Sequence, residues 1–409
     1  MPVINILLAN ILLFFILSNN TENPIFISPL KIPVSFSSNF GELRVDHFHS
    51  GVDIKTQGAT GKEVVAPADG YVYRISITPS GFGNALYLRH PSGYSTVYGH
   101  LEKFIPAIQE YVINQQYSKK SFNVTLYPPA DKFVFKQGDL IAYSGNSGGS
   151  SGPHLHYEMR KTENENPVNP LLFDFGIKDD IKPILEKLFI YPAASNTSIE
   201  GENKLKRISI TGSQGNYSLS TGEAINISGK ASFGLKAYDL FNDSNNKCAV
   251  YSIELKVDST TVFKYVMDEF SYNETRFVNA HIDYEIYIKE RTYIERLFSL
   301  PNDRLSTYKT NINRGIIDFN KEKEYNIQLI VSDIHRNKSR LSFIVKNNNN
   351  LLKPVKSSEN ISAIMPYNRT NRFRAEGVSL TIPTGALYDT LFFEYKRNRG
   401  NEDMYSDVY

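Results

Sequence analysis

The sequence predicts a mostly β protein with two or three domains. Its 409 residues are more than one ordinary hydrophobic core organises. The composition includes 26 Tyr and 25 Phe, and long Ala- and Leu-rich stretches are scarce, which favours strands over helices. Short segments of alternating apolar and polar residues recur along the chain, separated by turns rich in Gly, Pro, Asn and Asp.

Charge and cysteine content exclude several classes of protein. The net charge is +2 with both signs spread along the chain, so no basic face indicates a nucleic-acid partner. The single Cys248 excludes an intramolecular disulfide and a cysteine-based zinc site, so any metal must be held by His and carboxylate groups. Avoidance of cysteine fits an oxidising compartment.

The first residues indicate export. Residues 4–17 are apolar apart from Asn5 and Asn10, which is shorter than a membrane span of about 20 residues and suits the core of a signal peptide. No Lys or Arg precedes Lys31, however, and residues 18–20 are a poor cleavage site. We therefore expect residues 1–19 to be a signal peptide, or a membrane anchor if uncleaved, and the protein to act in the periplasm or cell envelope. Contact with the membrane is expected only if this segment is retained.

Residues 20–178 have the pattern of a β domain. Residues 63–75 are two short strands broken at a Pro-Ala-Asp-Gly turn, and residues 85–98 form a hairpin around Pro-Ser-Gly. Residues 104–131 interrupt the pattern as an insertion with a helical piece near 108–114. Residues 133–143 are again strand, turn and strand.

The rest of the chain predicts further β domains without visible catalytic residues. Residues 251–257, 325–331 and 341–345 alternate strictly, which predicts an immunoglobulin-like β-sandwich over 179–346. Residues 347–371 are polar and predict a linker. Residues 372–409 return to strand-like composition but are too few to bury a core, so they predict a partial third β module.

The residues that suggest chemistry lie in the first domain. A Gly- and Ser-rich loop, residues 145–152, leads into His154-Leu155-His156-Tyr157-Glu158, and a strand there places His154, His156 and Glu158 on one face. His49 stands four residues before Asp53. Imidazole and carboxylate are zinc ligands, and three of them with an open position are typical of a catalytic site. Taken singly each pattern is weak, because paired strand histidines can also be surface residues.

Together these patterns resemble the lysostaphin/LytM-type zinc metallopeptidase family over residues 34–173. The motifs that carry the resemblance are residues 49–53, 66–70, 93–101, 138–148 and 151–158. The resemblance implies an antiparallel β-sheet peptidase domain in which Zn²⁺ is held by His49, Asp53 and His156. It also implies that His100 and His154 are the catalytic histidines beside the metal.

The resemblance implies an exported zinc endopeptidase that hydrolyses peptide bonds in peptidoglycan stem peptides or cross-links. Metal-activated water with histidine acid/base assistance would carry out the reaction. The alternative is a non-enzymatic protein on the same fold that binds the cell wall or activates an amidase. Such relatives typically lack the metal ligands, which are present here. The C-terminal β domains would hold the peptidase near the wall or an envelope protein partner.

Five other residues are weighed separately. His47 could be a fourth ligand, but we expect a structural or substrate-edge role, and His90 is expected to be solvated at a hairpin. Glu158 either supports a metal-binding histidine or pairs with Arg160 or Lys161. His281 and His335 lie in the predicted sandwich and carry no functional signal.

Overall fold

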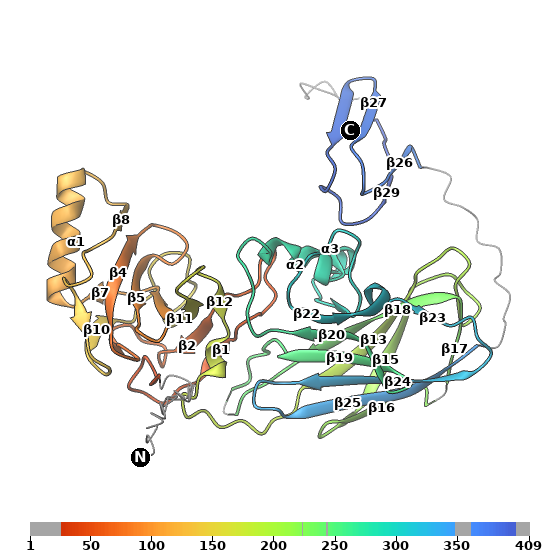
Figure 1. The fold of residues 1–409 in the computed structure, drawn as a ribbon, viewed down its shortest axis with the longest axis horizontal. Helices are drawn as coiled ribbons and strands as arrows, with labels where there is room; N and C mark the ends of the chain where they lie inside the picture. The colour runs from red at the N-terminus through yellow and green to blue at the C-terminus, as the bar shows by residue number, and fades with distance from the viewer. Residues whose placement is uncertain (1–25, 223, 243, 348–360, 398–409) are drawn as a thin grey trace, which may run out of the picture.

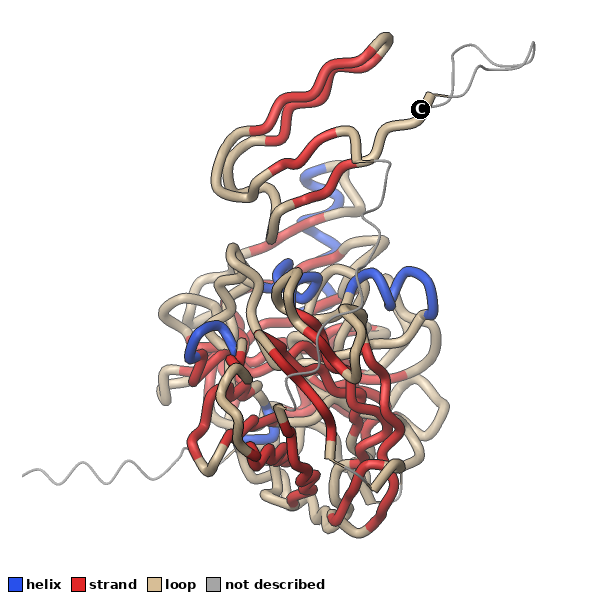
Figure 2. Tube along the Cα trace, turned by 90° about the vertical axis from the view of Figure 1, so that its right-hand side faces the viewer, coloured by secondary structure: helices blue, strands red, loops and turns tan. Residues whose placement is uncertain are grey.

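The computed structural model describes residues 26–222, 224–242, 244–347 and 361–397 (Figure 1). The predicted signal segment, 1–19, lies outside these residues. Strands predominate throughout, as the tube in Figure 2 shows, which confirms the predicted mostly β class. Among the described helices, none is long and apolar enough to cross a membrane.

The first domain is built on a nine-stranded sheet, with seven strands in the order β1-β2-β11-β6-β5-β4-β8. Neighbouring strands pair antiparallel, as predicted for this domain. The strands on this path are β1 (Phe36–Ser38), β2 (Val52–Lys55), β4 (Gly70–Ile77), β5 (Asn84–Arg89), β6 (Tyr94–Gly99), β8 (Val124–Leu126) and β11 (His154–Lys161). The two remaining strands, β9 (Val134–Phe135) and β12 (Pro167–Val168), pair with β4 and β11.

A smaller sheet and one helix complete the first domain. The sheet has the order β3 (Glu63–Val65), β10 (Leu140–Tyr143) and β7 (Lys103–Phe104). Helix α1 (Pro106–Lys119) lies in the insertion and is longer than the predicted piece at 108–114. It begins at a proline, which suits the first helical position, and ends at Lys120 in the left-handed conformation. Ile108 and Val112 bury its inner face in the domain core.

The second domain contains a 13-stranded sheet system. Its main path comprises β21 (Glu295–Arg296), β18 (Lys230–Tyr238), β13 (Ile184–Pro192), β15 (Lys206–Ser213), β16 (Asn216–Leu219), β25 (Lys338–Lys346), β24 (Glu324–Ser332), β19 (Ser252–Val257), β20 (Thr260–Val266) and β22 (Tyr308–Asn311). Strands β14 (Ser198–Ile199), β17 (Ile225–Ser228) and β23 (Ile317–Asp318) lie off this path. Short helical segments are η1 (Pro170–Leu172) in the first domain and η2 (Thr275–Phe277), α2 (Val278–His281), α3 (Tyr284–Glu290) and η3 (Ile312–Gly315) in the second.

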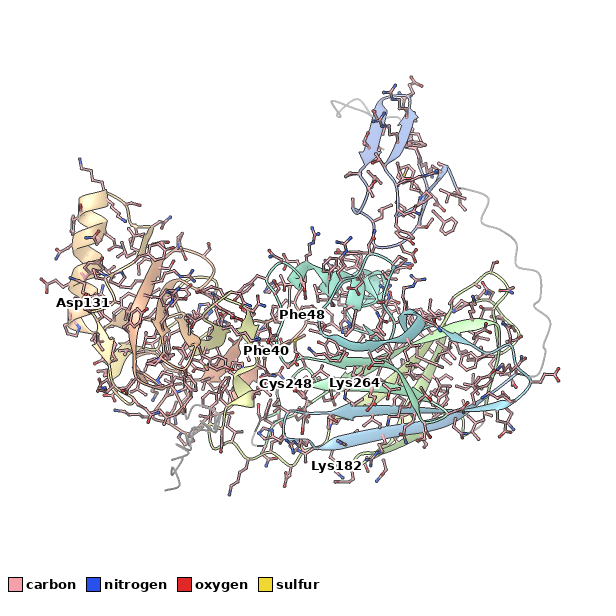
Figure 3. The ribbon with its side chains drawn as sticks, viewed as in Figure 1. Phe40, Phe48, Asp131, Lys182, Cys248 and Lys264 are labelled. Carbon is pink, nitrogen blue, oxygen red and sulfur yellow. The ribbon has the colours of Figure 1, made fainter. Side chains whose placement is uncertain are left out.

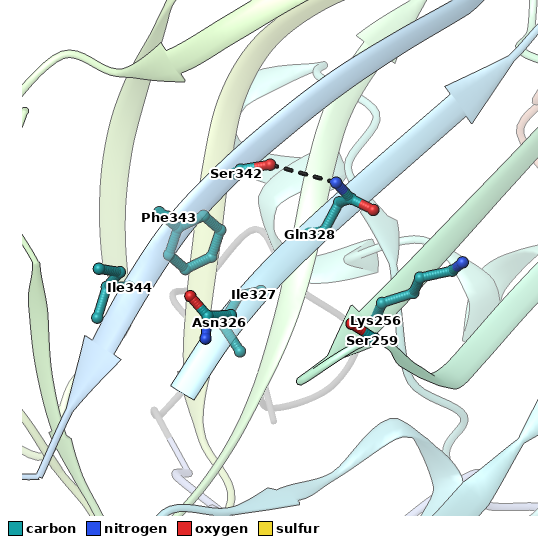
Figure 4. A pocket seen from close by; sticks show the side chains of 8 residues that line it. All are labelled: Lys256, Ser259, Asn326, Ile327, Gln328, Ser342, Phe343 and Ile344. Carbon is teal, nitrogen blue, oxygen red and sulfur yellow. Dashed lines mark hydrogen bonds between the residues drawn. The ribbon is translucent and has the colours of Figure 1, made fainter. Parts of the chain in front are cut away.

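The strictly alternating segments of the sequence are the central strands of this second domain. β24 pairs antiparallel with both β19 and β25, and the alternate apolar residues of all three strands are buried in one core. The opposite face carries polar side chains, among them Gln328, which donates to Ser342 across the strands at 3.5 Å. Figure 4 shows the shallow pocket around this pair, whose lining contains neither carboxylate nor imidazole. The immunoglobulin-like topology stays a prediction.

The C-terminal module consists of two small antiparallel pairs. β26 (Ala363–Met365) pairs with β29 (Leu391–Phe393), and β27 (Asn371–Ala375) pairs with β28 (Val378–Ile382). β26 lies inside the range 347–371 that the sequence assigns to a linker, so the ordered module begins earlier than predicted. Its contacts with the second domain include Asn302, which donates to the carbonyl of Leu387 at 2.6 Å.

The first two domains share an apolar interface. Phe40 and Phe48 of the first domain are each 1% exposed and belong to the core of the second domain. In the reverse direction, Phe241 and Cys248 belong to the core of the first domain. Figure 3 shows Phe40, Phe48 and Cys248 where the two domains meet. Asn39 also exchanges two hydrogen bonds with the backbone of Ala249, at 2.8 and 2.9 Å.

Because of this interface, we expect the first domain to be less stable alone than in the intact protein. A fragment of residues 20–178 would expose Phe40 and Phe48, each of which contributes about 1.5–3 kcal/mol when fully buried. We expect this fragment to unfold at a lower temperature than the first transition of the intact protein, measured by calorimetry. Removal of residues 361–409 alone is the control and should leave that transition unchanged. Equal transition temperatures for fragment and intact protein would show that the interface contributes little.

Candidate metal centre

Three ligand atoms from the first domain converge on one point. His49 Nε2 lies 3.1 Å from His156 Nδ1 and 3.2 Å from Asp53 Oδ1, and the last two atoms are 2.9 Å apart. Ligands bound tetrahedrally to zinc at about 2.0–2.1 Å are about 3.3 Å from one another. The three side chains therefore fit a zinc ion after small adjustments.

Strand register explains why these residues meet. In the antiparallel pair of β11 and β2, His156 stands opposite Asp53, and on its other side it faces Gly99 of β6. His49 precedes β2, and its Nδ1 lies 2.8 Å from the carbonyl oxygen of Asn39. Because a carbonyl can only accept, Nδ1 carries the proton and Nε2 is left as an unprotonated ligand atom.

The surroundings of these residues favour a cation. His49, Asp53 and His156 are 6%, 9% and 3% exposed. Burial opposes ionisation of Asp53, but His49 and His156 outweigh it and hold the pKa of Asp53 well below its usual range. Burial likewise opposes protonation of His156, yet Asp53 and Glu158 raise the pKa of His156 to about 9. Ionised Asp53 thus supplies negative charge at the point where the three atoms meet.

Glu158 supports the metal centre from behind. It is fully buried and lies 3.0 Å from Nε2 of His156, on the side of the ring away from Asp53. It also accepts from Ser50, from Arg160 Nε at 2.6 Å and from the hydroxyl of Tyr272 at 3.1 Å. Both interpretations of Glu158 therefore hold, since it contacts His156 and pairs with Arg160. Its predicted alternative partner Lys161 pairs instead with Glu269 at 2.6 Å.

His154 and His100 lie beside the three ligands with their rings 4.7 Å apart. His154 Nδ1 is 2.8 Å from the carbonyl oxygen of Gly152, and His100 Nδ1 is 2.8 Å from that of Ser147. Each Nδ1 is therefore the donor, so in the neutral ring each Nε2 carries a lone pair. Nε2 of His154 lies 3.6 Å from Asp53 Oδ1, and the His154 side chain is 18% exposed, so it borders solvent.

The backbone of His100 is strained. Its φ of 59° lies in the left-handed region, which non-glycine residues seldom adopt and which occurs preferentially at functional sites. Burial lowers the pKa of His100 to about 4, so its ring is neutral at pH 7.

Gly148, in the loop that supplies the carbonyl of Ser147, lies so close to Gly83 that a Cβ would be 2.3 Å from the Gly83 nitrogen. The glycines of residues 145–152 thus allow two loops to pack closely beside the site.

Two groups at the centre carry no signal in the sequence. Phe82 stacks on the ring of His156 with centroids 4.7 Å apart. Tyr272 comes from the second domain, 114 residues from Glu158 along the chain. Neither belongs to a motif, and both are placed by packing between distant segments.

The remaining histidines lie outside the centre. His47 is exposed and its ring is 2.6 Å from the carboxylate of Asp46. The prediction that His90 is solvated is wrong: it is 5% exposed and its ring nitrogens contact the carbonyl of Asp69 and the hydroxyl of Thr96. The turn places the His90 ring edge-on against the buried ring of Phe26. The sequence pattern of a hairpin does not reveal this contact. His281 is buried in the second domain beside Glu295.

Comparison with known families agrees with this geometry. Residues 47–117 and 129–170 match Peptidase family M23. The residues between these two ranges fall in the insertion. Residues 362–409 match the Zu5-like domain.

Similar proteins align over the first domain. An uncharacterized metalloprotease of Haemophilus influenzae is 37% identical over 123 residues, which are 30% of this chain and 20% of that protein. The DD-carboxypeptidase/endopeptidase Mpg of Neisseria meningitidis is 34% identical over 150 residues, covering 36% and 28% of the two chains. The crystal structure of a zinc-containing peptidase from Vibrio cholerae is 26% identical with a TM-score of 0.27, covering 36% and 39%. The aligned region spans less than a third of the length of the Haemophilus and Neisseria proteins.

Proposed function

We propose, from the premise that residues 47–170 form a peptidase domain of family M23, that this protein is a zinc-dependent endopeptidase of the cell envelope. It would hydrolyse peptide bonds in peptidoglycan stem peptides or cross-links. The observation that carries the proposal is the convergence of His49, Asp53 and His156 beside two further histidines with free Nε2 lone pairs. The name of the Neisseria relative, a DD-carboxypeptidase/endopeptidase, supports this substrate class.

His49, Asp53 and His156 would hold the zinc ion, and Glu158 would orient His156 through its Nε2 proton. A zinc ion bound by two imidazoles and one carboxylate keeps a net positive charge and an open position, so it lowers the pKa of a water molecule and polarises a carbonyl group. The buried Arg160 balances the charge of Glu158, which leaves Asp53 as the carboxylate that faces the metal.

His154 is placed to move the protons of the reaction. Its Nε2 carries a lone pair at the solvent side of the ligands, so it can take a proton from the attacking water and pass it to the leaving amine. His100 is neutral and also has an acceptor at Nε2, which suits it to accept a hydrogen bond from the same water. In this tautomer it cannot donate to a developing oxyanion. We therefore assign the general base to His154 and the orientation of water to His100.

The alternative is a non-enzymatic wall-binding or amidase-activating protein. The two functions differ in what happens to intact wall sacculi. An endopeptidase should release soluble fragments in a zinc-dependent manner, whereas a binding protein should cosediment with sacculi and release none. Release that persists after complete removal of zinc would contradict the proposal.

The second and C-terminal domains are proposed to position the peptidase domain near the wall or an envelope partner.

Substitution of Glu158 tests the support of the metal ligand. Glu158→Gln removes the charge that holds the Nε2 proton of His156, so zinc affinity should fall by roughly 10- to 100-fold. Competition with a coloured chelator measures this affinity. Glu163→Gln, at an exposed position five residues further on, is the matched control and should bind zinc as the parent does. Equal affinities for both variants would show that Glu158 serves only the pair with Arg160.

A further inference from the structure

A second cluster of carboxylates lies where the two large domains are joined. It consists of Asp179, Asp239 and Asp333, each of which offers an oxygen within 4.8 Å of the others. Asp179 lies in the segment between the domains, Asp239 directly follows β18, and Asp333 directly follows β24. The Asp179 side chain is 0% exposed, and Asp239 and Asp333 are each 1% exposed. Three acidic groups from distant parts of the chain are thus buried together.

Two of these carboxylates have oxygen atoms without a hydrogen-bond partner. Among the described residues, Oδ1 of Asp239 and Oδ2 of Asp179 are buried and unpartnered. Asp333, by contrast, accepts from the backbone and the side chain of Asn337, at 2.8 and 2.7 Å. Buried carboxylate oxygens without partners are unusual, because removal from water is costly unless another group replaces it. The unpartnered oxygens therefore indicate that a group is missing from the cluster.

The protein supplies too little positive charge to be that group. Within the described part of the chain, the ion pairs of these three residues comprise one contact, from His335 Nδ1 to Asp179 Oδ2 at 3.8 Å. Burial and the charges of Asp333 and Asp179 raise the pKa of Asp239 to about 8. Burial, with a contribution from Asp179, raises the pKa of Asp333 to about 6. When ionised, three carboxylates this close together repel one another, and a bound cation would remove that repulsion.

We propose that Asp179, Asp239 and Asp333 form a binding site for a calcium ion. Ca²⁺ takes oxygen ligands at about 2.3–2.6 Å, so two ligands of one ion are at most about 5 Å apart, in agreement with the observed cluster. Three carboxylates with no imidazole or thiolate among the candidate ligand atoms favour such a hard cation over zinc. Backbone carbonyls and water would complete its shell.

The ion would fix the first domain on the second. Asp179 accepts from the backbone nitrogen of Asn242 at 3.2 Å, and its carbonyl accepts from Asn337 at 3.0 Å. The loop that begins at Asp239 continues into the first domain, where Phe241 is buried in the core. One ion would therefore tie the inter-domain segment, this loop and the turn after β24 together. The site is separate from the zinc centre and acts on domain orientation.

Calorimetric titration of the intact, zinc-saturated protein with CaCl₂ tests the proposal. One Ca²⁺ should bind per chain without loss of zinc. At a free Ca²⁺ concentration of about 100 times Kd, the unfolding temperature should rise by roughly 5–10 °C. Asp239→Asn and Asp333→Asn should each lose this rise, while Asp318→Asn, at an exposed position of the same domain, should retain it.

Two outcomes overturn the proposal. One is the absence of saturable heat and of any rise in unfolding temperature for the parent protein at millimolar Ca²⁺. The other is unchanged Ca²⁺ binding in the folded Asp239→Asn or Asp333→Asn variant. The parent measurement decides the matter even if one variant does not fold. Because hydrolysis is not the readout, the result is independent of the proposed peptidase function.

Discussion

Replacement of His156 by alanine is expected to abolish zinc binding and hydrolysis together. The substitution removes one of three ligand atoms, and it also leaves the buried Glu158 without the ring that contacts it. Two ligands cannot hold zinc tightly, so the metal content should fall from about one ion per chain to background after dialysis. Elemental analysis measures the zinc, and cleavage of cross-linked muropeptides measures the activity.

His47→Ala is the control for this experiment. His47 lies two residues from a ligand but is exposed and pairs with Asp46, so its loss should change neither zinc content nor rate appreciably. Full zinc occupancy in the His156→Ala variant would contradict the ligand assignment. Loss of zinc in the His47→Ala variant would show that His47 is a fourth ligand.

Replacement of His154 by alanine should separate binding from turnover. His154 Nε2 borders the ligands without belonging to the group of three, so the zinc content should stay at about one ion per chain. Loss of a general acid and base typically lowers the rate by 10²–10⁴-fold, and we expect the fall in kcat rather than in KM. Steady-state cleavage of a soluble wall peptide measures both parameters.

The His154 variant also has a clear contrary result. Cleavage at the parent rate would exclude His154 as the proton carrier and would transfer that role to His100, whose Nε2 is also an acceptor. The double variant, with His100 and His154 both replaced, then distinguishes a shared role from an independent one. If the two act as a unit, the double variant should be no slower than the slower single variant.

The first domain could be largely anticipated from the sequence because its information is local. Strand alternation places His154, His156 and Glu158 on one face, and antiparallel pairing of β11 with β2 brings Asp53 opposite His156. The turns and hairpins that space these strands are marked by Gly, Pro and Asp. The same alternation identifies β19, β24 and β25 of the second domain, where polar and buried positions follow one another strictly.

What the sequence could not supply is contact between distant segments. Tyr272 reaches Glu158 across the interface at which Phe40 and Phe48 are buried in the second domain, and no local pattern encodes that docking. The burial of His90 and the stacking of Phe82 on His156 also depend on contacts between segments that are distant in the sequence. The cluster of Asp179, Asp239 and Asp333 is likewise invisible, because the three residues lie far apart along the chain.

The docked arrangement brings one residue of the second domain to the candidate metal centre. Tyr272 donates a hydrogen bond to Glu158. The guanidinium carbon of Arg160 lies over the Tyr272 ring, 5.0 Å from the ring centre. The second domain therefore completes the hydrogen bonds of the residue that orients His156. Under the proposed function, the second domain would therefore act on the metal centre as well as on the position of the peptidase domain.

Mass spectrometry of purified cross-linked muropeptides, after incubation with the intact, zinc-loaded protein, shows directly whether the protein hydrolyses wall cross-links. A sample stripped of zinc by a chelator is the control. We expect zinc-dependent conversion of dimers to monomers, and the fragment masses identify the bond that is cut. Unchanged dimers, despite one zinc ion per chain, would contradict this expectation and would favour a protein that binds the wall or activates another enzyme.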